Sequence, residues 1–169
     1  ADFVGEVAAA MAVVDGAIVM LCAASGVEVG AETAWAMAGR RHLPRLIFMN
    51  KMDRDNASFQ RTLEQAQSML DRAIIPVQLP IGAVKTFAGV VDLLQRKAYR
   101  YSREGDGKLE EAPIPDEMRD EVEQHRLALI EKIAETDDAL VEKYLEGTEL
   151  TDEEMRQGLR QGVQSGTIV

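Results

Sequence analysis

Residues 46–53 read LIFMNKMD, an apolar run that passes directly into an NKxD box formed by Asn50, Lys51 and Asp53. The run lacks the alternation of a half-exposed strand, so we expect a parallel strand that is covered on both faces. The box follows at the carboxyl end, where the nucleotide sites of open α/β sheets form. It is either a polar turn that closes the strand or a site that recognises a purine base, and the apolar strand before it favours the site.

The side chains of the box suit guanine. An Asp carboxylate accepts hydrogen bonds from both the ring N–H and the exocyclic amine of guanine, whereas adenine would leave a buried Asp53 unsatisfied. Asn50 can bond the other edge of the base and brace the loop, and the stem of Lys51 can lie over the purine ring. We therefore predict that Asn50, Lys51 and Asp53 bind guanine. Met52, at the variable position of the box, is a further candidate.

Composition points to an ordinary soluble domain with a full core, since 46% of the 169 residues are hydrophobic and 28% are charged. No apolar run approaches the roughly 20 residues that span a bilayer, and Asp2 and Glu6 stand where a secretory signal would be basic and apolar. The single cysteine, Cys22, is expected to be a buried small hydrophobe rather than a nucleophile. His42 has no ligand cluster around it, so we predict no metal site. These features favour a cytoplasmic protein with no membrane partner.

Acidic side chains are concentrated in one segment. The net charge is −10, and residues 104–154 alone hold nineteen acidic and five basic side chains. Such a segment would repel phosphate, so we expect no direct nucleic-acid binding. It is either a solvated face that keeps the domain soluble or a surface for a basic protein partner. Five carboxylates crowd the start of its predicted helix, where the helix dipole favours acids, without the spacing of a calcium loop: Asp116, Glu117, Asp120, Glu121 and Glu123.

Helices and strands alternate in the first part of the chain, which is typical of a parallel sheet with helical crossovers. The first helix would place Val7, Met11 and Val14 on one face, and Trp35 is expected in the core. The predicted elements are helix 3–14, strand 17–23, helix 32–40, strand 46–50 and helix 58–72.

The pattern changes after Pro76 to short strands separated by turns. Residues 77–82 and 89–102 read as strands, although Val90, Leu93 and Leu94 are also compatible with a short turn of helix. Residues 105–107 read Gly-Asp-Gly, which predicts a hairpin turn between AYRYS and KLEEA.

Helices are expected to dominate the rest. A long helix over 116–135 would bury a stripe formed by Met118, Val122, Leu129 and Ile133. A second helix begins at residues 136–137 and runs to 145. Thr151 and Glu154 form a capping box for a last helix, which ends at 165–166, and residues 167–169 resemble the start of a strand.

A phosphate-binding loop is missing from the sequence. The motif GxxxxGKS/T does not occur, and residues 26–30, although flanked by glycine, lack the Lys-Ser/Thr pair. These residues alone could hold a guanine base weakly but could not organise hydrolysis of GTP. We therefore predict no catalytic residue in this chain.

Nine strings in order resemble bacterial elongation factor G, the ribosomal translocase, which is a translational GTPase. The resemblance runs along the whole chain, and the strings are ADFxxEV, DGAIVMLCAASGVE, ETAW, PRLIFMNKMDR, LPIG, FAGVVDLL, KAYRY, DDALVEKYLEG and ELTDEEM. The resemblance implies that the chain is the middle of a GTPase domain, with the P-loop, switch I and a DTPGH motif before Ala1. Asp2 and Phe3 would then be a remnant of switch II. The sequence departs from the family at Val4, usually Thr, and at 29–30, usually Pro-Gln.

The fold implied is α/β, with a partial P-loop-GTPase-type parallel sheet and an inserted α+β subdomain. Residues 1–74 would be the partial GTPase domain, 75–163 the insert with its acidic helix, and 164–169 the start of the returning strand. In this family Asn50, Lys51 and Asp53 match the guanine-specificity positions. The parent would use GTP or GDP with Mg²⁺, whereas we expect the 169-residue chain to bind neither.

The same resemblance predicts the partner. In the family the acidic helix of the insert faces the stalk protein of the large ribosomal subunit, and residues 116–123 match that helix in position and charge. A ribosome-protection or release-factor GTPase, or a paralogue of elongation factor G, is an alternative within the class. A non-enzymatic module that binds a ribosomal protein is an alternative from another class.

Overall fold

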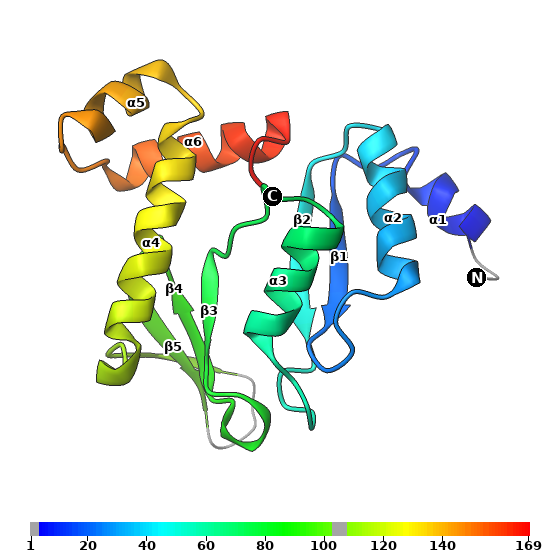
Figure 1. Ribbon diagram of the computed structural model, residues 1–169, viewed down its shortest axis with the longest axis horizontal. Helices are drawn as coiled ribbons and strands as arrows, with labels where there is room; N and C mark the ends of the chain where they lie inside the picture. The colour runs from blue at the N-terminus through cyan, green and yellow to red at the C-terminus, as the bar shows by residue number, and fades with distance from the viewer. Residues whose placement is uncertain (1–3, 103–107) are drawn as a thin grey trace. The chain divides into compact units, whose positions relative to one another are not determined.

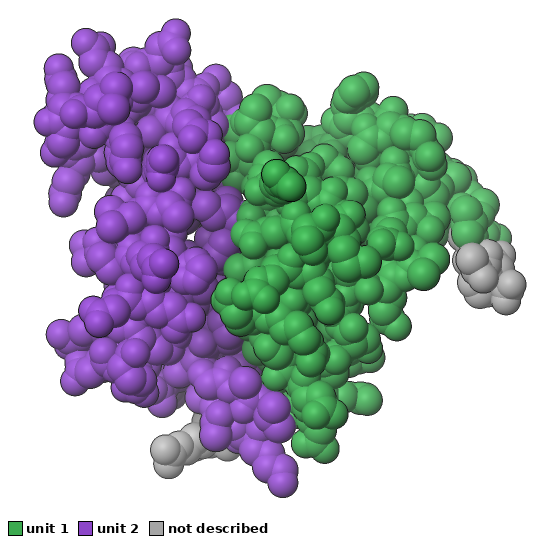
Figure 2. Space-filling view, in the orientation of Figure 1, with its two compact units in different colours: residues 1–74, 162–169 green, residues 75–161 purple. Residues whose placement is uncertain are grey.

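A computed structural model describes residues 4–102 and 108–169 (Figure 1). The described part divides into two compact units, which we call unit 1 (residues 1–74 and 162–169) and unit 2 (residues 75–161) (Figure 2). The division of the chain into domains at 74 and 163 stays a prediction, because compactness alone does not show that a segment folds by itself. The predicted α/β class is confirmed, since unit 1 has a parallel sheet and unit 2 a separate antiparallel one.

The parallel sheet of unit 1 pairs two strands within residues 4–74, with Ala17 opposite Arg45 and Cys22 opposite Asn50. Both strands therefore end at the same edge. A crossover helix joins them and a further helix follows the second strand, as predicted (Figure 1). The elements are α1 (Val4–Ala10), β1 (Ala17–Cys22), α2 (Val29–Arg40), β2 (Arg45–Asn50) and α3 (Phe59–Met69).

The core of unit 1 lies on one face of this sheet. Val19 and Leu21 of β1 pack in one cluster with Trp35 of α2 and with Leu63 and Ala66 of α3. Trp35 is 5% exposed, which confirms its predicted place in the core. Because alternate residues of a strand point to opposite faces, α2 and α3 bury one residue in two along each strand.

The other face of the sheet is exposed, and the prediction that β2 is covered on both faces is wrong for the described chain. Ile18, Met20, Leu46 and Phe48 point to this second face and are each at least half exposed. The two strands therefore carry more apolar side chains than α2 and α3 cover. Exposed apolar patches of this kind mark surfaces that another segment or molecule covers.

Several helix boundaries differ from prediction, and α3, for example, ends at Met69 rather than at residue 72. Helix α1 ends at Ala10 because the next amides turn to i−3 acceptors, with Ala12 N–H donating to Ala9 O (3.1 Å). Val7 and Val14 are exposed, and of the predicted face only Met11 is buried. Helix α2 begins earlier than expected because the carbonyl of Glu28 already accepts from Ala31 N–H (2.8 Å).

Residues 167–169 do not form a strand. Gly166 has φ 78°, and the N–H groups of Thr167 and Ile168 both donate to the Gly162 carbonyl, at 2.9 and 3.1 Å. These bonds fold the chain back onto the last turn of the preceding helix, α6 (Asp152–Ser165). Val169 N–H donates to Ala73 O (3.2 Å), which anchors the segment in unit 1.

Unit 2 contains an antiparallel sheet whose strands, in the described residues, follow the order β3-β4-β5-β6. The choice between a strand and a short turn of helix for residues 90–94 is thereby decided: Val90 lies in a strand, and Leu93 and Leu94 lie in the turn after it. The predicted pairing of AYRYS with KLEEA is confirmed by Tyr101 opposite Leu109, although the turn at 105–107 lies outside the described residues. The elements are β3 (Gln78–Ile81), the 3₁₀ turn η1 (Val84–Thr86), β4 (Gly89–Asp92), β5 (Lys97–Tyr101) and β6 (Leu109–Ala112).

The helices of unit 2 follow the predicted pattern closely. The long helix opens with a 3₁₀ turn, and its whole predicted stripe, from Met118 to Ile133, is buried. Asp137 caps the next helix by accepting from Ala139 N–H (2.9 Å). The elements are η2 (Asp116–Met118), α4 (Arg119–Ala134), α5 (Asp138–Leu145) and α6 (Asp152–Ser165). In residues 4–102 and 108–169, no helix is both long enough and apolar enough to cross a bilayer.

Candidate functional site

The NKxD box lies at the carboxyl edge of the parallel sheet, where β2 ends in Asn50 and a loop over residues 51–57 leads to α3. This loop stands beside the loop that follows β1. Ala23 N–H donates to Asn50 O (2.9 Å), which continues the ladder one residue beyond β1. The rigid sheet therefore fixes the first residue of the box.

Hydrogen bonds within the loop fix its backbone. The side-chain oxygen of Asn50 accepts from Lys51 N–H (2.8 Å), and Lys51 adopts a left-handed conformation with φ 62°. Arg54 N–H then donates to Lys51 O (3.2 Å) and Ala57 N–H to Arg54 O (3.1 Å), forming two successive turns. Asn50 thus braces the loop through a bond to its own neighbour.

Exposure divides the box into outward and inward side chains. Lys51 and Asp53 are exposed and Asn50 is half-buried, whereas Met52 is 6% exposed and packs into the interior. Within the described part of the chain no hydrogen bond or ion pair engages the Asp53 carboxylate. That carboxylate is free to accept hydrogen bonds from a ligand, while the Met52 side chain is turned away from one.

Helix α3 contributes three polar side chains to this edge that sequence reasoning missed. Arg61, Thr62 and Gln65 hydrogen-bond to the backbone of the loop after β1, and Arg61 also reaches the loop after β2. All three follow the helix's N-cap, Ser58, by three to seven residues. A polar row at positions i, i+1 and i+4 beside the apolar face of α3 was the available signal.

Cys22 closes the same edge from β1 and is half-buried, not fully buried as expected. A hydrogen bond with the Ser25 side chain lowers the pKa of the Cys22 thiol, with further lowering from backbone N–H groups of Ser25 and Ala24 and from the charge of Lys51. These contacts stabilise the thiolate form of Cys22.

The remaining predicted site residues lie elsewhere. Asp2 and Phe3, predicted as a remnant of switch II, fall outside the described residues. The five carboxylates between 116 and 123 belong to unit 2 and are all exposed. Among them, Asp116 pairs with Arg119 (2.6 Å) and Glu123 with Arg96 (3.2 Å).

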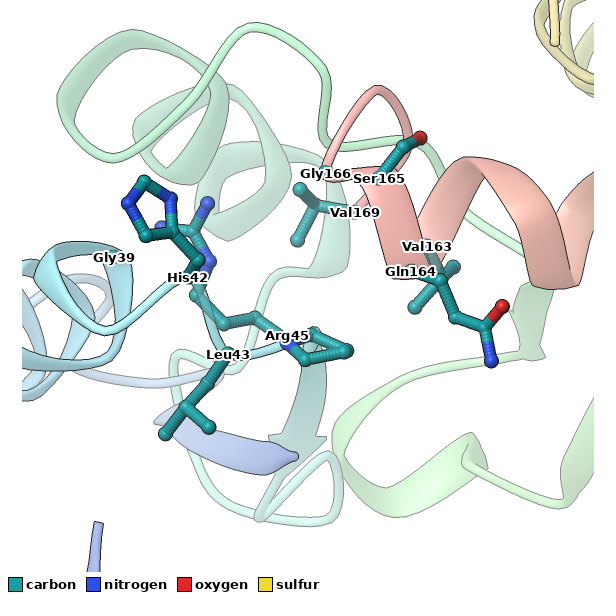
Figure 3. A pocket seen from close by; sticks show the side chains of 10 residues that line it. Gly39, His42, Leu43, Arg45, Val163, Gln164, Ser165, Gly166 and Val169 are labelled. Atoms are coloured by element: carbon teal, nitrogen blue, oxygen red, sulfur yellow. The ribbon is translucent and has the colours of Figure 1, made fainter. Parts of the chain in front are cut away.

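A separate hollow of about 170 Å³ occurs in unit 1 (Figure 3). Its lining includes His42 and Arg45 on one side and Ser165 on the other. Arg45 is the first residue of β2, so this hollow lies at the strand end opposite to the NKxD box. Arg45 stacks over the Trp35 ring (4.2 Å) and pairs with Asp71 (3.7 Å), which satisfies its charge within the unit. In the described residues, no group of His, Cys, Asp and Glu is arranged to hold a metal ion.

A parallel sheet with an NKxD loop at its carboxyl edge defines a nucleotide-binding class of α/β protein. Residues 1–161 match the model of the elongation factor Tu GTP binding domain family. The chain therefore belongs to this family, which is that of the translational GTPases.

A solved structure is also similar to this chain. A protein from Thermus thermophilus is 38% identical to this chain and superimposes with a TM-score of 0.89. The match covers 99% of this chain but only 24% of that protein. The chain thus spans about a quarter of the length of that relative.

Proposed function

We propose that this chain is the guanine-recognising part of a longer translational GTPase similar to elongation factor G. In such a protein, binding and hydrolysis of GTP would drive transfer RNAs and messenger RNA through the ribosome in the cytoplasm. The observation that carries the proposal is the position of Asp53, an exposed and unengaged carboxylate in a loop that β2 holds at the carboxyl edge of the sheet.

The chemistry of the loop fits guanine. The Asp53 carboxylate would accept hydrogen bonds from the ring N–H and the exocyclic amine. The side-chain oxygen of Asn50 is already used by Lys51 N–H, which leaves the amide NH₂ of Asn50 to donate to the acceptors O6 or N7 of guanine. The exposed stem of Lys51 would cover the ring. Met52 would support the loop from inside rather than contact the base.

Phosphate chemistry would come from other parts of the longer protein. Water attacks the terminal phosphate in such enzymes, and catalysis consists of positioning and charge stabilisation around GTP and Mg²⁺. The 169 residues contain no GxxxxGKS/T loop and no DTPGH motif. We therefore assign no catalytic role to its residues and propose that the 169 residues alone do not hydrolyse GTP.

The exposed face of the parallel sheet supports membership of a larger domain. Ile18 and Phe48 on this face would be costly to leave in water, since a buried side chain of this size contributes about 1.5–3 kcal/mol relative to an exposed one. We propose that residues 1–74 belong to a GTPase domain that covers this face, that residues 75–163 are an insert, and that residues 164–169 return to the GTPase domain.

The acidic start of α4 supports a basic protein partner, which we propose is the stalk protein of the large ribosomal subunit. The five carboxylates are exposed, and the three not engaged in the ion pairs described above are available to a partner: Glu117, Asp120 and Glu121. The same surface supports a second candidate, a non-enzymatic module that binds a ribosomal protein, because it needs no phosphate loop.

Replacing Asp53 with Asn in the longer protein tests the guanine role. The carboxamide gains the donor that xanthine needs, so we expect GDP to bind about 100-fold more weakly or worse and xanthosine diphosphate to bind better. Asp55→Asn is the matched control, because Asp55 is an exposed carboxylate of the same loop outside the box. Unchanged preference for GDP in Asp53→Asn would refute the proposed role.

A further inference from the structure

Arg61 of α3 joins the two loops at the carboxyl edge of the sheet. Its Nη2 atom lies 3.1 Å from Ala23 O and 2.8 Å from Ala24 O, in the loop after β1. The same atom of Arg61 lies 3.0 Å from Asn56 O, in the loop that carries the NKxD box. The Arg61 guanidinium therefore bridges the two loops.

The Ala23 carbonyl is the centre of this contact. It also accepts from Ser58 N–H (2.9 Å) and from the Thr62 hydroxyl (3.3 Å), and both Ala23 and Thr62 are fully buried. Donors that carry a charge form stronger hydrogen bonds than neutral ones, particularly away from water. Arg61 is the charged donor of this group, so its loss would weaken the attachment of both loops.

Gln65, one turn further along α3, holds the other end of the loop after β1. Its side-chain oxygen accepts from Val27 N–H (3.1 Å). Gly26 has φ 79°, and a Cβ atom at this position would lie 1.9 Å from the same oxygen. The left-handed backbone at Gly26 favours glycine, and any larger residue there would displace the Gln65 amide from this bond.

We propose that Arg61, assisted by Gln65, is a positioning residue for the guanine site. It does not touch the nucleotide. It fixes the carbonyl of Asn56, three residues after Asp53, to the loop after β1, so the Asp53 carboxylate is held in place before the base arrives. Such preorganisation improves affinity because less freedom is lost on binding. The inference rests on the proposed guanine role of Asp53.

Arg61→Ala and Arg61→Lys in the longer protein test this role. We expect Arg61→Ala to raise the dissociation rate of GDP about tenfold and to reduce the preference for GDP over xanthosine diphosphate. Lysine keeps the charge but not the several donors of the guanidinium group. The GDP dissociation rate and the base preference of Arg61→Lys should therefore lie between those of the wild type and those of Arg61→Ala. Gln60→Ala is the control, because Gln60 is on the same turn and its side chain bonds to Glu64 of the same helix (2.8 Å) rather than to either loop; it should leave both quantities unchanged.

Base preference separates a positioning role of Arg61 from a purely structural one. A purely structural role would change the urea midpoint but not the ratio of the affinities for GDP and xanthosine diphosphate. If Arg61→Ala does not fold, Arg61→Lys decides. Wild-type dissociation and preference in the folded Arg61 variants, alongside a switched preference in Asp53→Asn, would overturn this inference alone. Absence of any guanine preference in the wild type would overturn it together with the proposed function.

Discussion

Lys143 of α5 and Glu154 of α6 form an ion pair that joins two helices of unit 2. The Lys143 ammonium donates to one carboxylate oxygen, and the other oxygen accepts from the N–H and the hydroxyl of Thr151, each at 2.9 Å. The capping box predicted for α6 therefore also fastens α5. The hydrogen bond with Lys143, followed by those with Thr151, lowers the pKa of Glu154 to about 2.

This pKa predicts a specific pH dependence of stability. Because the pKa of Glu154 in the folded state lies below its ordinary value of 4.5, its contribution is complete above about pH 4.5 and is lost as the pH falls towards 2. Glu154→Gln should therefore lower the urea midpoint at pH 7 and lower it less at pH 3. Glu153→Gln, at an exposed neighbour, is the control. An equal loss at both pH values would contradict this role of Glu154.

Gly89 tests the antiparallel sheet. A Cβ atom at this position would lie 2.0 Å from the Tyr99 carbonyl oxygen, so β4 and β5 could not keep their pairing. We expect Gly89→Ala to lower the free energy of unfolding by about 2 kcal/mol or more. Gly30→Ala is the control, since nothing lies within 4 Å of its added Cβ and alanine favours helix α2. Similar effects of the two changes in urea unfolding would show that the pairing is different.

Leu129 tests the packing of α4. It is fully buried, whereas Leu127 on the same helix is 51% exposed. Leu129→Ala should cost about 2–5 kcal/mol of unfolding free energy, and Leu127→Ala less than about 1 kcal/mol. Thermal and urea unfolding measure both. A larger loss at Leu127 would mean that the opposite face of α4 is the buried one.

Asp120 tests the acidic surface. It is exposed and has no ion-pair partner in residues 4–102 and 108–169, so reversing its charge leaves the ion pairs of Arg119 and Arg96 intact. We expect Asp120→Lys to weaken binding of the stalk protein, measured by calorimetry, with a smaller effect at high salt. Glu64→Lys on α3 is the control. Equal binding by Asp120→Lys and wild type at low salt would leave the acidic face as a solvated surface.

Sequence patterns predicted the structure correctly where the spacing of apolar residues alone decides it. The stripe from Met118 to Ile133 repeats at helical spacing, and burial in α4 follows it. The alternation of strands and helices around residues 46–53 likewise predicted the parallel sheet and placed Asn50 at its carboxyl edge. Thr151 and Glu154 were found because their capping bonds are local.

Features that depend on distant or absent surfaces were beyond sequence reasoning. The apolar residues Ile18 and Phe48 suggested two covered faces, but apolar character does not say what supplies the cover. Arg61 was missed because its acceptors Ala23 and Ala24 lie 38 and 37 residues earlier. The left-handed conformation of Lys51 and the burial of Met52 were also not predicted, because no residue type nearby indicates them.

A crystal structure of the longer protein with GDP would test the guanine role of Asp53 most directly. We expect the two Asp53 carboxylate oxygens to lie about 2.7–3.2 Å from the ring nitrogen and the exocyclic amine of guanine. If the guanine role of Asp53 is wrong, its carboxylate will face solvent and the base will bind at another edge of the sheet.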